Sequence, residues 1–276
     1  MAGTLYLVPT PIGNLGDISP RMADTMAQAD FIAAEDTRVS LKLLNHLGLK
    51  KSMISYYRHN TEAGGQAVME RLLAGENCAL VTDAGTPAIS DPGQELVAQC
   101  AQQGIDVVAI PGPCALVTAL AVSGQPTDRF TFEGFLPMNK KNRRAHLDSL
   151  KGEERTMVFY EAPHKLNATL CDLREAFGEE RPISLCRELS KLHEEVRRTT
   201  LGEAARWYAD NQPKGEFVLV IRGAEPVEEQ EATLEDGLAR VAVLRAGGAS
   251  LKDAVKQAAR ELDLSKNELY DLALGH

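Results

Sequence analysis

Short apolar runs alternate with amphipathic stretches through the first 125 residues of the chain. The apolar runs predict buried strands at 4–8, 31–34, 53–57, 78–81 and 106–110. Between them, apolar positions at helical spacing predict helices at 20–29, 40–47, 61–74, 95–103 and 115–122. The sequence Ser19-Pro20 is typical of a helix start, with Ser19 as the N-cap. Such regular alternation of strand and helix indicates a parallel sheet.

The pattern changes after residues 123–127, a segment with Gly124 and Pro126 that is the best linker candidate. Beyond it, strands are predicted at 130–132, 156–160, 183–186 and 216–221, and helices at 165–177 and 203–211. A changed ratio of strands to helices and a hairpin-like spacing predict a mixed sheet. We therefore expect one α/β domain at 1–124 and a second at 125–225.

An acidic segment at 226–231 predicts a second linker, which leads into a helical tail. Apolar residues recur at helical spacing over 234–244 and 251–262, and Ser265 to Glu268 has the sequence of a capping box. The last two helices resemble a helix-turn-helix, although most such pairs are only packing units. The predicted fold class is α/β, with two α/β domains and a small C-terminal helical module at 226–276.

The composition is that of an ordinary globular protein, with 44% hydrophobic and 25% charged residues among 276. No apolar run approaches the about 18 residues that span a membrane, and residues 1–7 do not resemble a secretion signal. The five cysteines are scattered without a CxxC pair, which argues against a zinc site and a disulfide framework. We expect a cytoplasmic protein with reduced thiols, no metal and no membrane contact.

The net charge of −9 disfavours a nucleic-acid partner at first sight. The acidic excess, however, lies before residue 126 and after residue 223, and the region between them is close to neutral. Its densest basic run comprises Lys140, Lys141, Arg143 and Arg144. This run is either a solvated loop or a patch that contacts phosphates. The tail is acidic as a segment, which argues against its docking on RNA as a recognition helix. We expect it instead to contact ribosomal protein, the partner subunit, or one local RNA feature reached by Lys252, Lys256 and Lys266 on a single face.

Polar residues follow several predicted strands, where the ligands of open α/β sheets bind. Asp83 follows the strand 78–81, in a loop that two prolines make rigid and in which Gly85 allows close approach of the backbone. The sequence EDTR at 35–38 follows the strand 31–34, although Asp36 could simply cap the next helix. The loop 9–14 carries two prolines where a dinucleotide-binding turn would carry glycines, so a dinucleotide is not expected.

Seven sequence motifs, taken in order along the chain, resemble the motifs of a known family. They are VPTPIGN at 8–14, AAEDTR at 33–38, DAGTPAISDPG at 83–93, PGPC at 111–114, EGFLP at 133–137, FYEAPH at 159–164 and RELS at 187–190. With them the chain resembles the ribosomal RNA small subunit methyltransferase I family of tetrapyrrole methylase-like (class III) methyltransferases, which use S-adenosylmethionine. The resemblance covers about residues 5–221, and the tail is similar to the extension of that subfamily.

This resemblance implies two α/β domains with S-adenosylmethionine in the cleft between them. It implies methylation of the ribose 2′-hydroxyl of a cytidine in the decoding region of 16S ribosomal RNA, by a cytoplasmic homodimer without a metal. The assembled small ribosomal subunit and free RNA both stay open as substrates.

The resemblance also assigns the cofactor to particular residues. They are Pro11, Gly13, Asp83, Ala84, Gly85, Thr86, Ile89, Pro113, Cys114, Ala115, Phe135 and Leu136. Cys114 replaces a commoner Ser or Thr, so a backbone contact is expected there in place of a hydroxyl bond. Pro11 and Gly13 stand where many relatives have a Gly-rich loop, and we expect them to shape the cleft and exclude larger substrates.

Methyl transfer from a sulfonium needs the ribose oxygen held in line at about 3 Å and a group that takes its proton. The candidates at strand ends are Glu35, Asp36, Glu161, His164, Arg187, Glu188 and Lys214, and the sequence does not choose among them. His164 is equally a helix-start residue or an imidazole oriented by Glu161. Arg38, Arg187, Lys140, Lys141, Arg143 and Arg144 are expected to contact RNA phosphates.

Two alternative functions stay open. One is a tetrapyrrole (precorrin-type) methylase of the same fold, against which the loop 9–14 and the basic run at 140–144 argue. The other is a non-catalytic RNA-binding or assembly protein, against which the intact loop at 83–93 argues.

Overall fold

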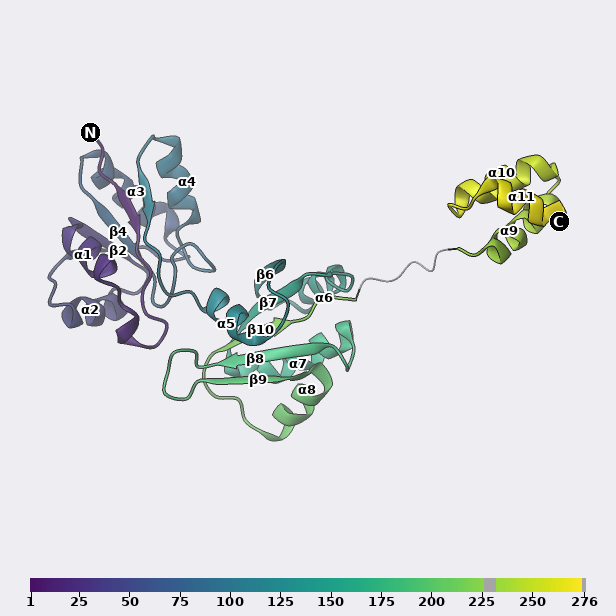
Figure 1. The fold of residues 1–276 in the computed structure, drawn as a ribbon. Helices are drawn as coiled ribbons and strands as arrows, with labels where there is room; N and C mark the ends of the chain where they lie inside the picture. The colour runs from purple at the N-terminus through teal and green to yellow at the C-terminus, as the bar shows by residue number, and fades with distance from the viewer. Residues whose placement is uncertain (226–231, 275–276) are drawn as a thin grey trace. The chain divides into compact units, whose positions relative to one another are not determined.

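The computed structural model describes residues 1–225 and 232–274. The chain divides into two compact units, Met1–Ala224 and Glu225–His276 (Figure 1). The first unit contains two five-stranded sheets, and the second contains helices. This matches the predicted fold class of α/β layers followed by a helical module.

The first sheet is parallel throughout, as the alternation of strand and helix predicts, with the spatial order β3-β2-β4-β1-β5. Its strands are β1 (Leu5–Leu7), β2 (Phe31–Ala34), β3 (Ser52–Ser55), β4 (Cys78–Val81) and β5 (Val107–Ala109). The connecting helices are η1 (Leu15–Asp17), α1 (Pro20–Gln28), α2 (Thr37–His46), α3 (Thr61–Leu73) and α4 (Gln94–Gln102). Because β4 and β1 are central, the loops that follow them open at the middle of the sheet's carboxyl edge.

Both faces of this sheet are covered, which explains its almost wholly apolar strands. Alternate residues of β2 point to opposite faces, so Phe31 packs with α3 and α4 while Ile32 packs with α1 and α2. Ser19 caps α1 and Asp36 caps α2, as their positions in the sequence predict. The strand ends are thereby held between two helical layers.

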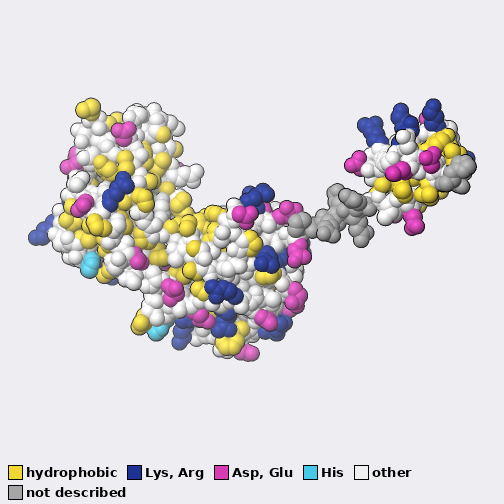
Figure 2. Space-filling model, in the orientation of Figure 1, with side chains coloured by type: hydrophobic (Ala, Val, Ile, Leu, Met, Phe, Trp, Pro, Cys, Tyr) yellow, Lys and Arg dark blue, Asp and Glu magenta, His cyan; other side chains and the backbone are white. Residues whose placement is uncertain are grey.

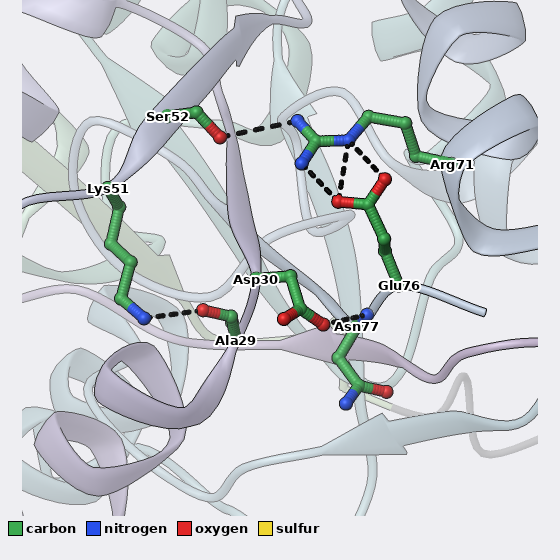
Figure 3. Close-up of polar contacts among 7 residues, drawn as sticks. All are labelled: Ala29, Asp30, Lys51, Ser52, Arg71, Glu76 and Asn77. Atoms are coloured by element: carbon green, nitrogen blue, oxygen red, sulfur yellow. Dashed lines mark hydrogen bonds and ion pairs between the residues drawn. The ribbon is translucent and has the colours of Figure 1, made fainter. Parts of the chain in front are cut away.

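A polar network ties together the amino ends of these strands, away from the loops of the carboxyl edge (Figure 3). Arg71 of α3 forms an ion pair with Glu76 and a hydrogen bond of 3.3 Å to Ser52, and its guanidinium lies over the Phe31 ring. Lys51 donates to the Ala29 carbonyl at 2.6 Å, and the Asn77 amide donates to Asp30 at 2.7 Å. These contacts fix β2, β3 and β4 relative to one another.

The second sheet is mixed, as predicted, with the order β6-β7-β10-β8-β9. Its strands are β6 (Phe130–Phe135), β7 (Thr156–Glu161), β8 (Pro182–Arg187), β9 (Glu195–Thr200) and β10 (Phe217–Ile221). Only the β6–β7 pair is parallel among the pairs of this sheet. Four helices pack against it: α5 (Ala115–Ser123), α6 (Lys140–Ser149), α7 (Pro163–Phe177) and α8 (Leu201–Asp210).

Three features differ from the sequence-based expectation. The basic run at 140–144 is the first half of helix α6 and not a loop, because Asn139 caps the amides of Lys141 and Asn142. Strand β9 was not predicted, because its sequence EVRRTT lacks an apolar run. Helix α5 precedes the predicted boundary at 124/125, yet Leu116 and Leu120 pack on the second sheet.

The tail forms three helices, α9 (Leu234–Ala246), α10 (Leu251–Glu261) and α11 (Lys266–Leu274), around a small core of its own. Of the capping box predicted at 265–268, the structure holds the bond from the Glu268 amide to the Ser265 hydroxyl, at 3.5 Å. Across residues 1–225 and 232–274, no helix is long and apolar enough to cross a membrane.

Candidate functional site

The loops singled out in the sequence meet at a cavity of about 420 Å³ within the first unit. Its walls come from the loops after β1, β2 and β4, from the start of α5, and from the facing ends of β7, β8 and β10. The lining residues are Ile12, Glu35, Thr82, Asp83, Ala84, Gly85, Thr86, Ile89, Ser90, Asp91, Cys114, Ala115, Phe135, Tyr160, Glu161, Ala162, Pro163, Cys186, Leu189, Lys191, Glu216, Phe217 and Val218. Segments far apart in the sequence therefore share one pocket.

Most of the residues assigned to a cofactor lie on this cavity. Those that line it are Asp83, Ala84, Gly85, Thr86, Ile89, Cys114, Ala115 and Phe135. Pro11, Gly13, Pro113 and Leu136 lie outside the lining. Leu136 is buried in the apolar core under the second sheet, and the Pro113 carbonyl accepts a hydrogen bond from the Thr86 hydroxyl at 2.9 Å.

The loop 82–93 is held in a shape that depends on several backbone contacts. Thr10 and Gly85 exchange two backbone hydrogen bonds of 2.8 and 2.9 Å, which join the loops after β1 and β4. Gly85 has φ +90°, and a Cβ there would lie 3.4 Å from Ile12 Cγ2. Ala88 and Ser90 have φ +66° and +67°, a region that costs non-glycine residues about 1 kcal/mol or more each. Strained backbone of this kind clusters at binding sites.

The carboxyl groups of Glu35, Asp83 and Asp91 line the cavity. Thr82 Oγ1 donates to Glu35 Oε2 at 2.7 Å, and the Asp36 amide donates to Asp83 Oδ1 at 3.1 Å. Burial raises the pKa of Asp83. Burial, and after it the nearby Glu35, raise the pKa of Asp91 to about 6. The pocket thus has an excess of acid and suits a cationic ligand.

Asp91 was missed as a site residue from the sequence. It lies within the motif 83–93, but its Asp-Pro-Gly context indicates only a turn. Tyr160 and Lys191 were also missed. The Tyr160 hydroxyl accepts a hydrogen bond of 3.0 Å from the Leu116 amide, in the first turn of α5, where the Cys114 side chain makes no capping bond. An aromatic residue from the second sheet thereby caps the helix at the cavity wall.

Glu161 lies on the cavity with both carboxylate oxygens engaged. Its Oε1 accepts from the Ala162 amide at 2.8 Å, and its Oε2 accepts from the Thr169 hydroxyl of α7. Arg143 in turn donates to Thr169 Oγ1 at 2.8 Å and pairs with Asp172 at 2.5 Å. The residue is 4% exposed. These contacts tie the end of β7 to α7, and each oxygen keeps a lone pair, so Glu161 stays a candidate for taking the substrate proton.

Most of the remaining candidates for catalysis lie outside the lining of the cavity. Glu35 is on the cavity, but Asp36 is turned to Arg38, whose guanidinium bonds hold the pKa of that carboxyl at about 2. His164 and Lys214 are exposed and outside the lining. Arg187 faces Glu195 at 3.6 Å.

Glu188 accepts from Lys191 Nζ at 2.8 Å and does not line the cavity itself. Lys191 Nζ also reaches Glu216 at 2.8 Å. This lysine therefore bridges two carboxylates, and no local sequence pattern predicts that Glu216 lies beside it.

The cations expected to meet RNA do not form one group. Arg38 is exposed at the mouth of the site, with 87% of its side chain accessible. Lys140, Lys141 and Arg144 are exposed on α6, where Arg144 lies 3.9 Å from Asp148. Arg143 points inward to Thr169 and Asp172, and its side chain is only 13% exposed. We no longer expect it to contact a phosphate.

The acidic residues of the site make no metal centre. Within residues 1–225 and 232–274, the structure groups no three His, Cys, Asp or Glu side chains in a way that could hold a metal ion. The five cysteines are unpaired in this structure.

Comparison with known proteins gives concordant results. Residues 4–205 match the family model of the tetrapyrrole (corrin/porphyrin) methylases. A protein of Synechocystis sp. named ribosomal RNA small subunit methyltransferase I is 49% identical over 272 residues, which cover 99% of this chain and 98% of that protein. Its namesake in Halalkalibacterium halodurans is 46% identical over 273 residues, covering 98% and 94%.

The fold has solved counterparts. The chain is similar to uroporphyrin-III C-methyltransferase from Thermus thermophilus, crystallised in complex with S-adenyl homocysteine, with a TM-score of 0.57 and 16% identity. The likeness covers 79% of this chain and 97% of that protein. At this identity it shows a shared fold.

Proposed function

The chain belongs to the tetrapyrrole methylase family, in its ribosomal RNA small subunit methyltransferase I branch, and on that premise we propose that it transfers a methyl group from S-adenosylmethionine to 16S ribosomal RNA. The acceptor in this proposal is the 2′-hydroxyl of a cytidine ribose in the decoding region. The observation that carries it is the acidic, rigid-walled cavity where the motifs at 33–38, 83–93, 111–114 and 159–164 meet.

The residues of the cavity fit S-adenosylmethionine by their chemistry. That molecule carries a sulfonium and an ammonium group, and Glu35, Asp83 and Asp91 bring negative charge to the cavity. An apolar wall that includes Ile12 and Leu189 suits an adenine ring. Gly85 has no side chain at a point where a Cβ would touch Ile12, so the backbone there can approach a ligand closely.

The cofactor supplies an electrophilic methyl group when bound. Positioning by the chain then supplies much of the rate, because the loops after β1 and β4 are joined through Thr10 and Gly85 and hold a fixed wall. The hydroxyl of the acceptor must lose a proton. Asp91 is the best placed acceptor, because it lines the cavity and its pKa of about 6 suits a base at neutral pH.

The cytoplasmic location and the homodimer are parts of the same proposal, supported by the resemblance to the rRNA methyltransferase branch. A tetrapyrrole methylase is the weaker alternative. Relatives that are 43–49% identical and cover nearly the whole chain carry the rRNA methyltransferase name, whereas the uroporphyrin-III C-methyltransferase of Thermus thermophilus is only 16% identical. A non-catalytic RNA-binding protein would have no use for the acidic cavity.

A methylation assay tests the proposal on isolated small subunits and on naked 16S RNA, with labelled S-adenosylmethionine. We expect methyl transfer to a ribose 2′-oxygen, and cofactor binding in the micromolar range by calorimetry. Asp83→Ala should abolish binding, because it removes a carboxylate from the cavity wall and the partner of the Asp36 amide. Asp210→Ala, at the exposed end of α8, is the matched control. Unchanged cofactor binding in Asp83→Ala would refute this site.

A further inference from the structure

Cations gather along one flank of helix α10 in the tail. Lys252, Lys256 and Arg260 recur at intervals of four residues and are all exposed. Four residues of α-helix rise about 6 Å and turn by little more than one revolution, so the three side chains form a row about 12 Å long. Figure 2 shows Lys and Arg side chains gathered along the edge of the module where Figure 1 places α10.

The acidic side chains of the same helix are used within the module. Asp253 accepts from the Ser250 hydroxyl at 2.6 Å, at the helix start. Glu261 pairs with Arg240 of α9 at 2.7 Å and accepts from Gln257 at 2.9 Å. No carboxylate of the described residues forms an ion pair with the three cations of the flank. Their charge is therefore directed to solvent.

The net negative charge of the tail lies largely in the linker segment that precedes its helices. Residues 232–274 hold six basic and seven acidic side chains, so the folded module is almost neutral. Four further acids, Glu225, Glu228, Glu229 and Glu231, belong to the segment before it. The net charge of the whole tail, which argues against a recognition helix, averages over these two parts. A neutral module with its cations on one flank has a basic surface all the same.

We propose that the flank formed by Lys252, Lys256 and Arg260 binds the phosphate backbone of RNA. Lysine and arginine at regular spacing along an exposed helix fit a row of phosphates, and they carry no base specificity. Helix α11 stands where a helix-turn-helix would have its recognition helix, but it carries Lys266 against Glu268 and Asp271. The inference rests on the proposed function, since it gives the tail the role of holding the RNA substrate of the same enzyme.

The test compares two double variants of the full chain, Lys252→Ala with Lys256→Ala, and Arg245→Ala with Lys266→Ala. Each removes two exposed cations from the same module, but only the first pair lies on the flank. Binding to naked 16S RNA is measured from low to high salt. The flank variant should bind about tenfold more weakly at 0.1 M salt, with a salt slope shallower by roughly 1.5. The control should match wild type, and a Lys252→Arg, Lys256→Arg variant should keep wild-type binding.

Equal RNA binding by the flank variant and the control overturns the inference. Normal binding to naked RNA with poor methylation of assembled subunits also overturns it, and would identify a ribosomal protein as the partner of the flank. Failure of the proposed function looks different, because wild type itself would then methylate neither substrate. Cofactor binding should be the same in all of these variants, because none of the substituted residues lines the cavity.

Discussion

Gly13 and Lys191 lie in such close contact that a Cβ atom at residue 13 would sit 2.3 Å from Lys191 Cγ. Gly13 belongs to the loop after β1, and Lys191 follows β8 of the second sheet and lines the cavity. The φ of Gly13 is +153°, which side chains rarely adopt. The expected role of Gly13 in shaping the cleft therefore has a physical basis, because it lets the lysine cross the loop and reach Glu188 and Glu216.

Gly13→Ala should weaken cofactor binding by about tenfold, because an overpacked contact costs about 1–3 kcal/mol and here displaces a residue of the cavity wall. Calorimetry with S-adenosylmethionine measures this. The matched control is Gly152→Ala, where a Cβ would meet nothing within 4 Å. If the two variants bind the cofactor equally well, the close contact of Gly13 with Lys191 has no bearing on the cavity.

The exposed cations of α6 give a second prediction. A variant with Lys140, Lys141 and Arg144 changed to alanine should keep cofactor binding and lose RNA affinity, with a salt slope shallower by roughly 2–3. The reason is that their charges lie in solvent and outside the cavity. Filter binding of 16S RNA at several salt concentrations measures both quantities. An unaltered slope would mean that this part of α6 is only a solvated helix face.

The central strands were predictable because β2 and β4 are buried on both faces and must be apolar throughout. The same reasoning fails at the edge of the second sheet. In β9, Arg197 lies over the Trp207 ring with 4.1 Å to its centroid, and Arg198 donates to the Ser123 carbonyl at 3.0 Å. A strand built from such contacts carries no apolar run. Helix α6 was missed for a similar reason, since Leu147 is its only buried residue among those described.

The candidate site was predictable where it follows a strand end in sequence, as at Asp83. Asp91 was not predictable, because its place depends on the path of the loop through two left-handed residues, Ala88 and Ser90. The contact of Arg143 with Thr169 joins residues of two helices and has no local signal. A basic run in a sequence does not reveal that one of its members turns inward.

The pKa of Asp91 gives a prediction for stability. Its folded value is raised to about 6 from 3.8, so the folded protein binds the proton more tightly than the unfolded chain does. The free energy of unfolding of the wild type therefore falls as pH rises from 4 to 6, because the folded protein loses its more tightly bound proton there. Above pH 6 this loss of stability stays constant. Asp91→Asn should melt about 2–4 °C higher than wild type at pH 7.5, after allowance for partial solvent exposure, and at the same temperature at pH 3.5. If Asp91→Asn raised the melting temperature equally at both pH values, the result would contradict the raised pKa of Asp91.

The same group couples cofactor binding to pH. A cationic ligand favours the ionised carboxylate, so binding below pH 6 should release a proton and be weaker than at pH 7.5. Calorimetry in buffers of different ionisation enthalpy counts the protons. In Asp91→Asn the release should vanish, and methylation should lose its dependence on pH near 6 if Asp91 takes the proton of the hydroxyl.

Arg143 gives the last prediction. The basic run in the sequence predicts that it contacts RNA, whereas in the structure it contacts Thr169 and Asp172, and Thr169 in turn donates to Glu161. Arg143→Ala leaves Asp172 without its ion pair and the Thr169 hydroxyl without a donor, so it should lower stability by about 1–3 kcal/mol. It should also weaken cofactor binding, because Glu161 on the cavity wall loses part of its support.

Arg144→Ala, one residue along and 79% exposed, should instead reduce only RNA affinity. Thermal melts, calorimetry and RNA binding of the two variants separate these roles. If Arg143→Ala kept wild-type stability and cofactor binding and lost only RNA affinity, Arg143 would belong to the phosphate-binding surface after all.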